Sequence, residues 1–424
     1  MRDIMVVPAW LAPLLTRKML VCVLTGFASG MPLYLLLNLL PAWLRTEGVD
    51  LKVIGFFALI QFPYTWKFFW APLLDRYSPL QLGRRRGWML LTQVGLLFSI
   101  GALGGFDPAA NIWPVMTLSA VLALFSATQD IALDAFRREI LEDRELGLGN
   151  AVHVNAYRVA GLVPGSLSLI LADYLPWAEV FWITALFMLP GMVMAWLVKE
   201  PAVVSQPKSL REAVVEPFQE FMNRQGVRSA LWVLAFIFFY KLGDSLCTAL
   251  ATPFYLDMGY SKTDIGVIAK NAFLWPSVIG GLLGGLWMVK LGINRALWVF
   301  GVVQVVSILG FVWLADVGPQ AVIGPTERSA LALVIAFEAL GIGLGTAAFV
   351  AFIARSTNPA YTATQFALFT SLAVVPRTFI NASAGVLVEA MGWVNFFWLC
   401  VALAIPGMLM LLKVAPWSDT EQSA

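Results

Sequence analysis

The chain has few of the side chains that metal, redox or nucleophilic chemistry needs. Its 424 residues include one histidine, His153, and three cysteines, Cys22, Cys247 and Cys400. Each cysteine lies in an apolar run and none belongs to a CxxC pair, so the sequence predicts neither a metal site nor a disulfide framework. His153 is interpreted as a polar residue near the end of its apolar run. We therefore expect no enzyme, no bound metal and no resident cofactor.

Charge is also scarce. Only 13% of the residues are charged, whereas soluble domains carry about a quarter. The net charge of +2 gives no reason to expect nucleic acid as a partner. The chain is instead 59% hydrophobic, with a mean hydropathy of +0.78. The N-terminus lacks the short apolar stretch and small-residue cleavage site of a cleaved signal peptide. These properties predict a polytopic membrane protein with the lipid bilayer as its surroundings.

The apolar residues fall into twelve runs, each near the length at which a helix crosses a bilayer. The sequence therefore predicts an all-α membrane protein with twelve transmembrane helices. The approximate cores of the runs are 18–44, 52–75, 87–106, 112–138, 148–173, 177–198, 229–256, 263–289, 296–315, 328–354, 362–389 and 392–413.

Basic residues are concentrated in every other loop, which predicts how the chain is oriented in the membrane. With both termini cytoplasmic, the opposite side holds only Arg45, Lys52, Lys262 and Arg328. This asymmetry is typical of the positive-inside rule. The cytoplasmic segments then contain Arg2, Arg17, Lys18, Arg76, Arg84, Arg85, Arg86, Arg137, Arg138, Arg144, Lys199, Lys208, Arg211, Arg224, Arg228, Lys290, Arg295, Arg355 and Lys413.

The two halves of the chain resemble each other. Residues 48–55 match residues 259–266 at an offset of 211, and residues 173–182 match residues 389–398 at an offset of 216. We interpret this as a tandem duplication and predict an N-terminal six-helix bundle, a linker with one amphipathic helix near Leu210–Met222, and a C-terminal six-helix bundle. Parallel repeats of this kind are typical of the major facilitator architecture, whose binding site lies between the halves. The predicted boundaries are 1–198, 199–228 and 229–424.

Ionisable residues inside the apolar runs are the strongest functional signal. Asp130 and Asp134 are four residues apart, so they share one helical face, with Ser126 above and Arg137 below. A carboxylate in hydrocarbon costs about 3 kcal/mol even on lenient insertion scales, so such groups should face a polar cavity or a cation. We expect the charges of both halves to converge on one chamber in the middle of the membrane. The residues concerned are Lys67, Asp130, Asp134, Arg158, Lys241, Asp244, Lys270, Glu338, Arg377 and, near an end, Glu389.

Two interpretations of these charges stay open. They can be structural salt bridges, such as Asp130 with Arg158 or Lys241 with Asp244. They can also serve transport, because the surplus of cations suits an anionic substrate and buried acids suit proton coupling. For proton coupling we predict Asp130, Asp134, Asp244 and Glu338. For substrate binding we predict Gln61, Lys67, Gln129, Arg158, Lys241, Lys270, Gln365 and Arg377.

The loop after the second run predicts a gate. Asp75-Arg76, followed by Gly83-Arg84-Arg85-Arg86, resembles the cytoplasmic signature of the major facilitator superfamily. In that signature an acidic residue and the basic residues after it hold helix ends together in one conformation. The resemblance implies that Asp75, Arg76 and Arg84 take part in gating.

Longer motifs resemble the AmpG-type muropeptide permeases of Gram-negative inner membranes. The resemblance covers nearly the whole chain and implies residues that matter at Gly30, Gln129, Asp130, Arg158, Lys241 and Asp244. The matching stretches are 26–33, 67–77, 83–88, 126–130, 157–158, 240–244, 363–368 and the region of Arg377.

What the resemblance implies is import of anhydro-muropeptides, N-acetylglucosamine joined to anhydro-N-acetylmuramic acid with or without a stem peptide. The family couples this import to protons for cell-wall recycling. The expected partners are thus an amino-sugar or peptide substrate and protons, with a proton gradient in place of a cofactor, in a protein expected to be a monomer. Alternative interpretations are a permease for a siderophore or an acyl-CoA-like solute, a membrane-embedded transferase, and a sensor that transports nothing.

Overall fold

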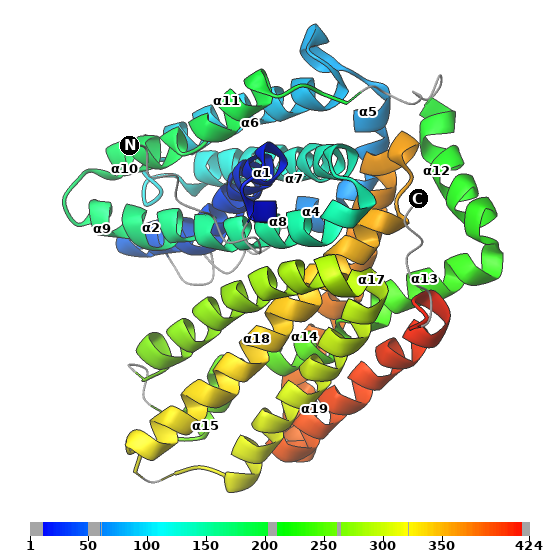
Figure 1. The fold of residues 1–424 in the computed structure, drawn as a ribbon. Coiled ribbons are helices and arrows are strands. Elements are labelled where there is room, and N and C mark those ends of the chain that lie inside the picture. The colour runs from blue at the N-terminus through cyan, green and yellow to red at the C-terminus, as the bar shows by residue number, and fades with distance from the viewer. Residues whose placement is uncertain are drawn as a thin grey trace, which may run out of the picture. The chain divides into compact units, whose positions relative to one another are not determined.

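A computed structural model describes residues 12–49, 60, 62–201, 210–260, 264–320 and 322–417. Every regular element in these ranges is a helix (Figure 1). Nine of the described helices are long and apolar enough to cross a membrane. The predicted run 52–75 is described only in part, so that crossing is not among the nine. The prediction of an all-α membrane protein is confirmed.

The chain forms two compact units. Unit 1 comprises residues 1–142, 152–219 and 357–371, and unit 2 comprises residues 143–151, 220–356 and 372–424. These units differ in detail from the predicted bundles, because 143–151 belongs to unit 2 and 357–371 belongs to unit 1. The predicted division at 198 and 229 stays a prediction. The linker helix forms as expected, as α12 (Leu210–Gln225).

Unit 1 is built around α7, the helix that carries Asp130 and Asp134. α1 and α6 pack against α7, and α10 and α11 pack against α6 (Figure 1). Side chains cap two of these helices, since Asn111 accepts from the Trp113 amide at 3.1 Å and Thr16 from the Met19 amide at 3.2 Å. The elements of unit 1 are η1 (Ala12–Leu14), α1 (Arg17–Tyr34), η2 (Leu35–Leu39), α2 (Leu40–Thr46), α4 (Phe62–Trp66), η4 (Lys67–Phe69), α5 (Ala71–Arg76), η5 (Pro79–Gln81), α6 (Arg84–Leu103), α7 (Ile112–Ile140), most of α8 (Leu146–Ala160), η7 (Val163–Leu167), α9 (Ser168–Ala172), α10 (Trp177–Leu186), α11 (Leu189–Leu197), η9 (Pro359–Tyr361) and the start of α19 (Thr362–Val414).

Two glycines bring α1 close to α8. A Cβ on Gly30 would lie 2.9 Å from the carbonyl carbon of Tyr157, and one on Gly26 would lie 2.9 Å from that of His153. Only a residue without a side chain fits at such distances, so the Gly26-x-x-x-Gly30 spacing brings the two backbones together. The contact places the polar residues of α8 beside those of α1.

Unit 2 contains the other long helices. In α17 a non-helical glycine, Gly292 (φ 73°, ψ 165°), separates two arms that correspond to two predicted runs. Gly392 (φ 75°, ψ 166°) divides α19 in the same way. Positive φ is accessible to glycine at little cost, which explains why the chain breaks at these points. The elements of unit 2 are η6 (Asp143–Glu145), the start of α8, α13 (Val227–Phe239), α14 (Leu242–Ala249), α15 (Ala251–Asp257), η8 (Ile265–Ala269), α17 (Lys270–Val317), α18 (Pro325–Ser356) and the rest of α19.

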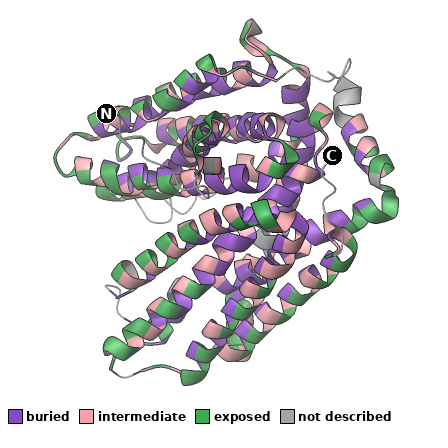
Figure 2. Ribbon diagram, in the orientation of Figure 1, coloured by how far each residue is buried: buried purple, intermediate pink, exposed green. Residues whose placement is uncertain are grey.

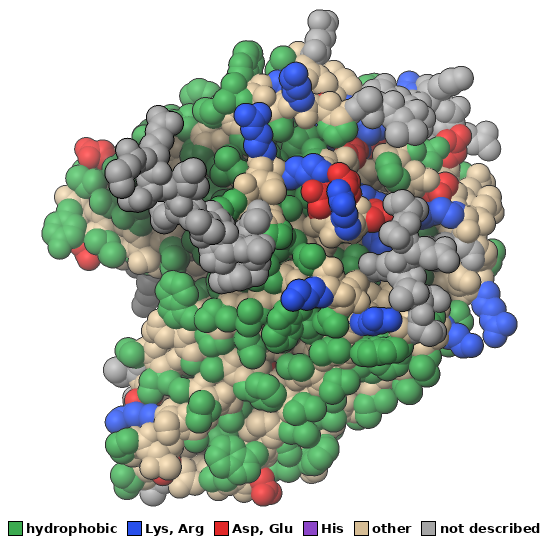
Figure 3. All heavy atoms as spheres, in the orientation of Figure 1, with side chains coloured by type: hydrophobic (Ala, Val, Ile, Leu, Met, Phe, Trp, Pro, Cys, Tyr) green, Lys and Arg blue, Asp and Glu red, His purple; other side chains and the backbone are tan. Residues whose placement is uncertain are grey.

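The outer surfaces of the helices are apolar, as expected for contact with lipid. Figure 2 shows helices with buried residues on one side and exposed residues on the other. Hydrophobic side chains spread widely over the visible surface in Figure 3. Examples are Trp287, Val302 and Trp313 on α17, which are 46%, 51% and 52% exposed.

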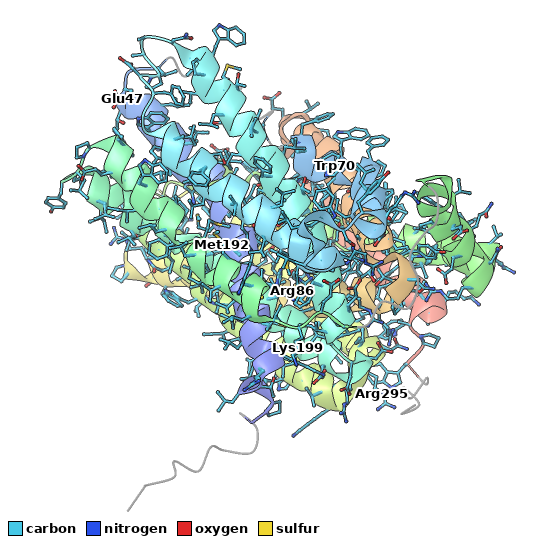
Figure 4. All side chains as sticks on the ribbon, turned by 90° about the horizontal axis from the view of Figure 1, so that it is seen from above. Glu47, Trp70, Arg86, Met192, Lys199 and Arg295 are labelled. Carbon is cyan, nitrogen blue, oxygen red and sulfur yellow. The ribbon has the colours of Figure 1, made fainter. Side chains whose placement is uncertain are left out.

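The two ends of unit 1 carry the loops that the charge pattern assigned to opposite sides. Figure 4 shows Glu47 at one end, and Arg86 and Lys199 near each other towards the other. Arg86 Nε donates to the Ala195 carbonyl at 3.0 Å, and Glu200 accepts from the Arg85 amide at 2.9 Å. The loop between runs two and three therefore lies at the same end as the exit of run six.

Candidate functional site

A buried lysine marks a helix interruption in each unit. Lys67 opens η4, directly after Trp66 departs from helical geometry (φ −103°, ψ 8°). In unit 2, Lys241 itself has nearly the same backbone angles as Trp66 (φ −104°, ψ 9°), and it separates α13 from α14. The two lysines are 7% and 5% exposed. Interrupted helices in membrane proteins commonly lie where a cavity or ligand meets the backbone.

The predicted acidic face of α7 forms a polar cluster in unit 1. Asp134 lies 2.8 Å from Arg137 Nη2 and 3.8 Å from Lys67 Nζ. Asp130, one turn earlier, accepts a hydrogen bond of 2.6 Å from Ser29 on α1. The two carboxylates thus have different surroundings, since Asp134 lies between cations and Asp130 faces a hydroxyl.

His153 belongs to this cluster, although the sequence suggested only a polar residue near a helix end. Its ring is buried, with Nε2 4.0 Å from Asp134 Oδ1 and Nδ1 3.1 Å from the Thr25 hydroxyl. The signal that could have found it is helical spacing, because His153 and Tyr157 are four residues apart on α8. Tyr157 lies 5.5 Å from Tyr34, ring centre to ring centre. Arg158, next in the chain, is half-buried.

Several buried polar atoms beside α7 have no hydrogen-bond partner among the described residues. These are the hydroxyls of Tyr64 and Ser126 and the Oε1 atom of Gln129. The Nε2 atom of Gln129 donates to the Ala28 carbonyl at 2.7 Å, which orients the amide. Buried polar groups are rarely left unsatisfied, so this surface is suited to water or a polar ligand.

A second polar cluster lies in unit 2. Lys241 forms an ion pair with Asp244, and Gln304 on α17 donates to the same carboxylate at 2.9 Å. The Oδ1 atom of Asp244 is buried without a partner among the described residues. Glu338 on α18 is 1% exposed, and its Oε1 atom also has no partner within the described ranges. The Lys241–Asp244 pair that the sequence predicted is present.

The other residues predicted to bind substrate lie in different surroundings. Both ends of the Gln365 amide bond the backbone, because Oε1 accepts from the Asn358 amide at 2.6 Å and Nε2 donates to the Pro217 carbonyl at 2.9 Å. Lys270 is exposed at the start of α17. Gln61 lies outside the described residues, as does the side chain of Arg377.

The predicted gate residues form a network at one end of unit 1. Asp75 is fully buried and lies 2.7 Å from Arg85 Nη2, which also lies 2.7 Å from Glu139. The amide and hydroxyl of Thr364 donate to Asp75 at 2.9 and 2.7 Å. Arg84 lies 3.1 Å from Glu139. Arg76 lies over the Tyr77 ring at 5.4 Å.

Sequence reasoning missed the partners in this network. It named Arg84, whereas Arg85 is the residue between two carboxylates, and it did not find Glu139 or Thr364. Within the described part of the chain, no group of three histidine, cysteine or acidic side chains could hold a metal ion. The contacts of the network residues are ion pairs and hydrogen bonds.

Comparison with known proteins assigns the family. The model of the Major Facilitator Superfamily matches residues 19–375. The chain is 53% identical over 404 residues to an uncharacterized protein of Haemophilus influenzae, covering 95% of each chain. It is 39% identical over 395 residues to the anhydromuropeptide permease of Escherichia coli K12, covering 92% of this chain and 78% of that one.

Solved structures support the same fold. The transporter FucP, in its outward conformation, has a TM-score of 0.71 at 13% identity and covers 96% of this chain and all of its own. The proton:xylose symporter XylE has a TM-score of 0.69 at 12% identity, covering 94% and 95%. At such identities the likeness concerns the fold alone. The family model and the 39% identity to the E. coli permease show that the chain belongs to the Major Facilitator Superfamily, as an AmpG-like permease and multi-pass membrane protein rather than an enzyme.

Proposed function

We propose that the protein imports anhydro-muropeptides across the bacterial inner membrane by proton symport, with both termini in the cytoplasm. The similarity to the E. coli anhydromuropeptide permease supports this substrate class. Such solutes carry carboxylates and many amides. The buried cations Lys67 and Lys241 at helix interruptions suit the carboxylates, and the unsatisfied atoms of Gln129, Tyr64 and Ser126 suit the sugar and amide groups.

The observation that carries the proposal is a division among the four predicted acids. Asp134 and Asp244 are paired with cations. Asp130 and Glu338 form no ion pair with any described residue, and the one hydrogen bond of Asp130 comes from Ser29. A carboxylate removed from water without an ion pair in direct contact is costly, and binding a proton reduces that cost. We therefore assign proton loading to Asp130 and Glu338, and assign Asp134 and Asp244 to holding the two lysines.

The lysines connect proton and substrate in this mechanism. Each lies beside an acid that holds it in place, and a substrate carboxylate would compete with that acid for the ammonium group. Lys67, Lys241 and Arg158 would bind the anionic groups, while Gln129 would face the sugars. The roles predicted for Gln61, Lys270, Gln365 and Arg377 remain predictions of the same kind.

The network of Asp75, Arg85 and Glu139 would stabilise one transport conformation. Thr364 lies in the first turn of α19, so its hydrogen bonds to Asp75 join segments from both halves of the sequence. Opening at this end would break those bonds and expose a buried ion pair to water. We assign gating to Asp75 and Arg84, as predicted, with Arg85 as the central cation.

Uptake into proteoliposomes tests the proposal. The full chain, reconstituted with an inward-directed pH gradient, should accumulate radiolabelled N-acetylglucosaminyl-anhydro-N-acetylmuramic acid. Asp130→Asn should abolish the gradient-driven part, while Asp173→Asn, the same change at an exposed loop residue, should leave it intact. Retained gradient-driven uptake in Asp130→Asn would refute the coupling role. Uptake of a ferric siderophore or an acyl-CoA in place of the disaccharide would refute the substrate.

A further inference from the structure

Unit 2 contains a cavity of about 240 Å³ that no part of the proposed transport mechanism uses. One wall comes from η6 and the start of α8, including Asp143, Arg144 and Gly147. The other wall is the turn of α17 from Met288 to Arg295. None of the lining residues belongs to the Lys67, Lys241 or Asp75 clusters described above.

The lining is rich in positive charge. Arg144, Lys290 and Arg295 line the cavity together with a single carboxylate, that of Asp143. Lys290 is exposed and Arg295 is half-buried. Arg295 Nε donates to the Trp417 carbonyl at 3.4 Å, which leaves its two Nη groups to other acceptors. Three cations around one cavity favour an anion as the occupant.

The backbone around the cavity adds positive charge. The positive φ of Gly292 ends the first arm of α17, and the second arm starts at the cavity wall. The N-terminus of a helix carries partial positive charge, which suits an anion. Gly147 allows the opposite wall to approach, because a Cβ there would lie 2.8 Å from Met288 Cβ.

The surface beside the cavity is apolar. Val289 lines the cavity and is 52% exposed, Trp287 two residues before it is 46% exposed, and Trp417 is 53% exposed. Basic pockets flanked by exposed apolar side chains at the end of membrane-crossing helices suit a phospholipid, whose phosphate and acyl chains meet both kinds of surface. A soluble phosphate would use the cations but not these side chains.

We propose that this cavity binds a phosphate-bearing anion, and that the headgroup of an anionic phospholipid supplies it. Arg144, Lys290 and Arg295 bind the phosphate oxygens, and Trp287 and Val289 contact the start of the acyl chains. The site is separate from substrate transport and does not depend on which solute the protein carries.

Native mass spectrometry of the purified full chain tests the site. We expect phosphatidylglycerol to be retained in preference to phosphatidylcholine. Each basic residue near a membrane surface contributes about a fivefold gain in affinity, so the double variant Lys290→Gln/Arg295→Gln should bind phosphatidylglycerol at least tenfold more weakly. The matched control, Lys199→Gln/Arg228→Gln, removes two exposed cations elsewhere and should bind as the wild type does.

A second variant controls for loss of binding that is caused by misfolding. Lys290→Arg/Arg295→Lys keeps both charges and should keep the preference for phosphatidylglycerol. If the glutamine variant binds phosphatidylglycerol as tightly as the control does, the site is refuted. Inorganic phosphate distinguishes the source of the anion. If millimolar phosphate displaces phosphatidylglycerol from the wild type, the lipid assignment is wrong and the ligand is a soluble phosphate.

Discussion

The Ser29 hydroxyl donates to Asp130 Oδ1 across the contact between α1 and α7, with the two oxygens 2.6 Å apart. Among the described residues, it is the one hydrogen bond to this carboxylate. A hydrogen bond to a charged group stabilises the charged form by roughly 1.5–3 kcal/mol, whereas it does less for the protonated form. Ser29 therefore adjusts how readily Asp130 gives up a proton.

Replacing Ser29 should shift the pH profile of transport. In Ser29→Ala the charged form of Asp130 loses its donor, so the proton is held to higher pH. We expect the profile of gradient-driven uptake to move by about one pH unit towards alkaline values. Ser99→Ala is the control, because that buried hydroxyl bonds only the carbonyls of its own helix. An unchanged profile in Ser29→Ala would show that the hydrogen bond has no part in coupling.

Variants of the Lys241–Asp244 pair should affect thermal stability and uptake differently. Lys241→Met leaves a buried carboxylate without its cation and should destabilise the protein by about 3 kcal/mol. Lys241→Met/Asp244→Asn removes both charges and should recover most of the thermal stability in detergent without recovering uptake. A double variant that transports normally would mean that the pair is a structural salt bridge only.

Arg85 should matter more to stability than its neighbour Arg86. Arg85→Gln leaves the buried carboxylates of Asp75 and Glu139 without their shared cation, which should cost about 3 kcal/mol. Arg86 bonds backbone carbonyls, among them that of Ala195 at 3.0 Å, so Arg86→Gln should cost about 1 kcal/mol. Thermal unfolding of the two purified variants in parallel gives the comparison. Equal losses would contradict the central place of Arg85 in the network.

Gly30→Ala should separate α1 from α8. The added Cβ would lie 2.9 Å from the carbonyl carbon of Tyr157, and the backbone there cannot move as a flexible side chain would. We expect a loss of about 2 kcal/mol in stability and a fall in uptake, because overpacking of this kind costs 1–3 kcal/mol. Gly385→Ala is the control, since a Cβ at Gly385 meets nothing within 4 Å. Normal stability and uptake in Gly30→Ala would exclude a role for the close contact.

Local spacing made part of the site predictable from the sequence. Asp130 and Asp134 share one face of α7 because they are four residues apart within a long helix, and the Lys241–Asp244 pair follows from a spacing of three. The lengths of the apolar runs predicted the helical fold for the same reason, because a run length is a local property of the sequence.

Contacts between distant segments could not be predicted in this way. Ser29 and Asp130 are 101 residues apart, and Asp75 and Thr364 are 289 apart. Helical periodicity indicates which side chains share a face but not which neighbour that face meets. Gln365 illustrates the limit, because its spacing in the sequence did not indicate that both ends of its amide bond the backbone.

The single left-handed residue at Gly292 has a consequence for how the protein moves. With so short a connection, the two arms of α17 have almost no slack at the end where they meet. A displacement of one arm at that end must carry the other with it. During a transport cycle the two arms will therefore move together as one hairpin. Any change in the angle between them will displace their far ends more than the ends that meet at Gly292.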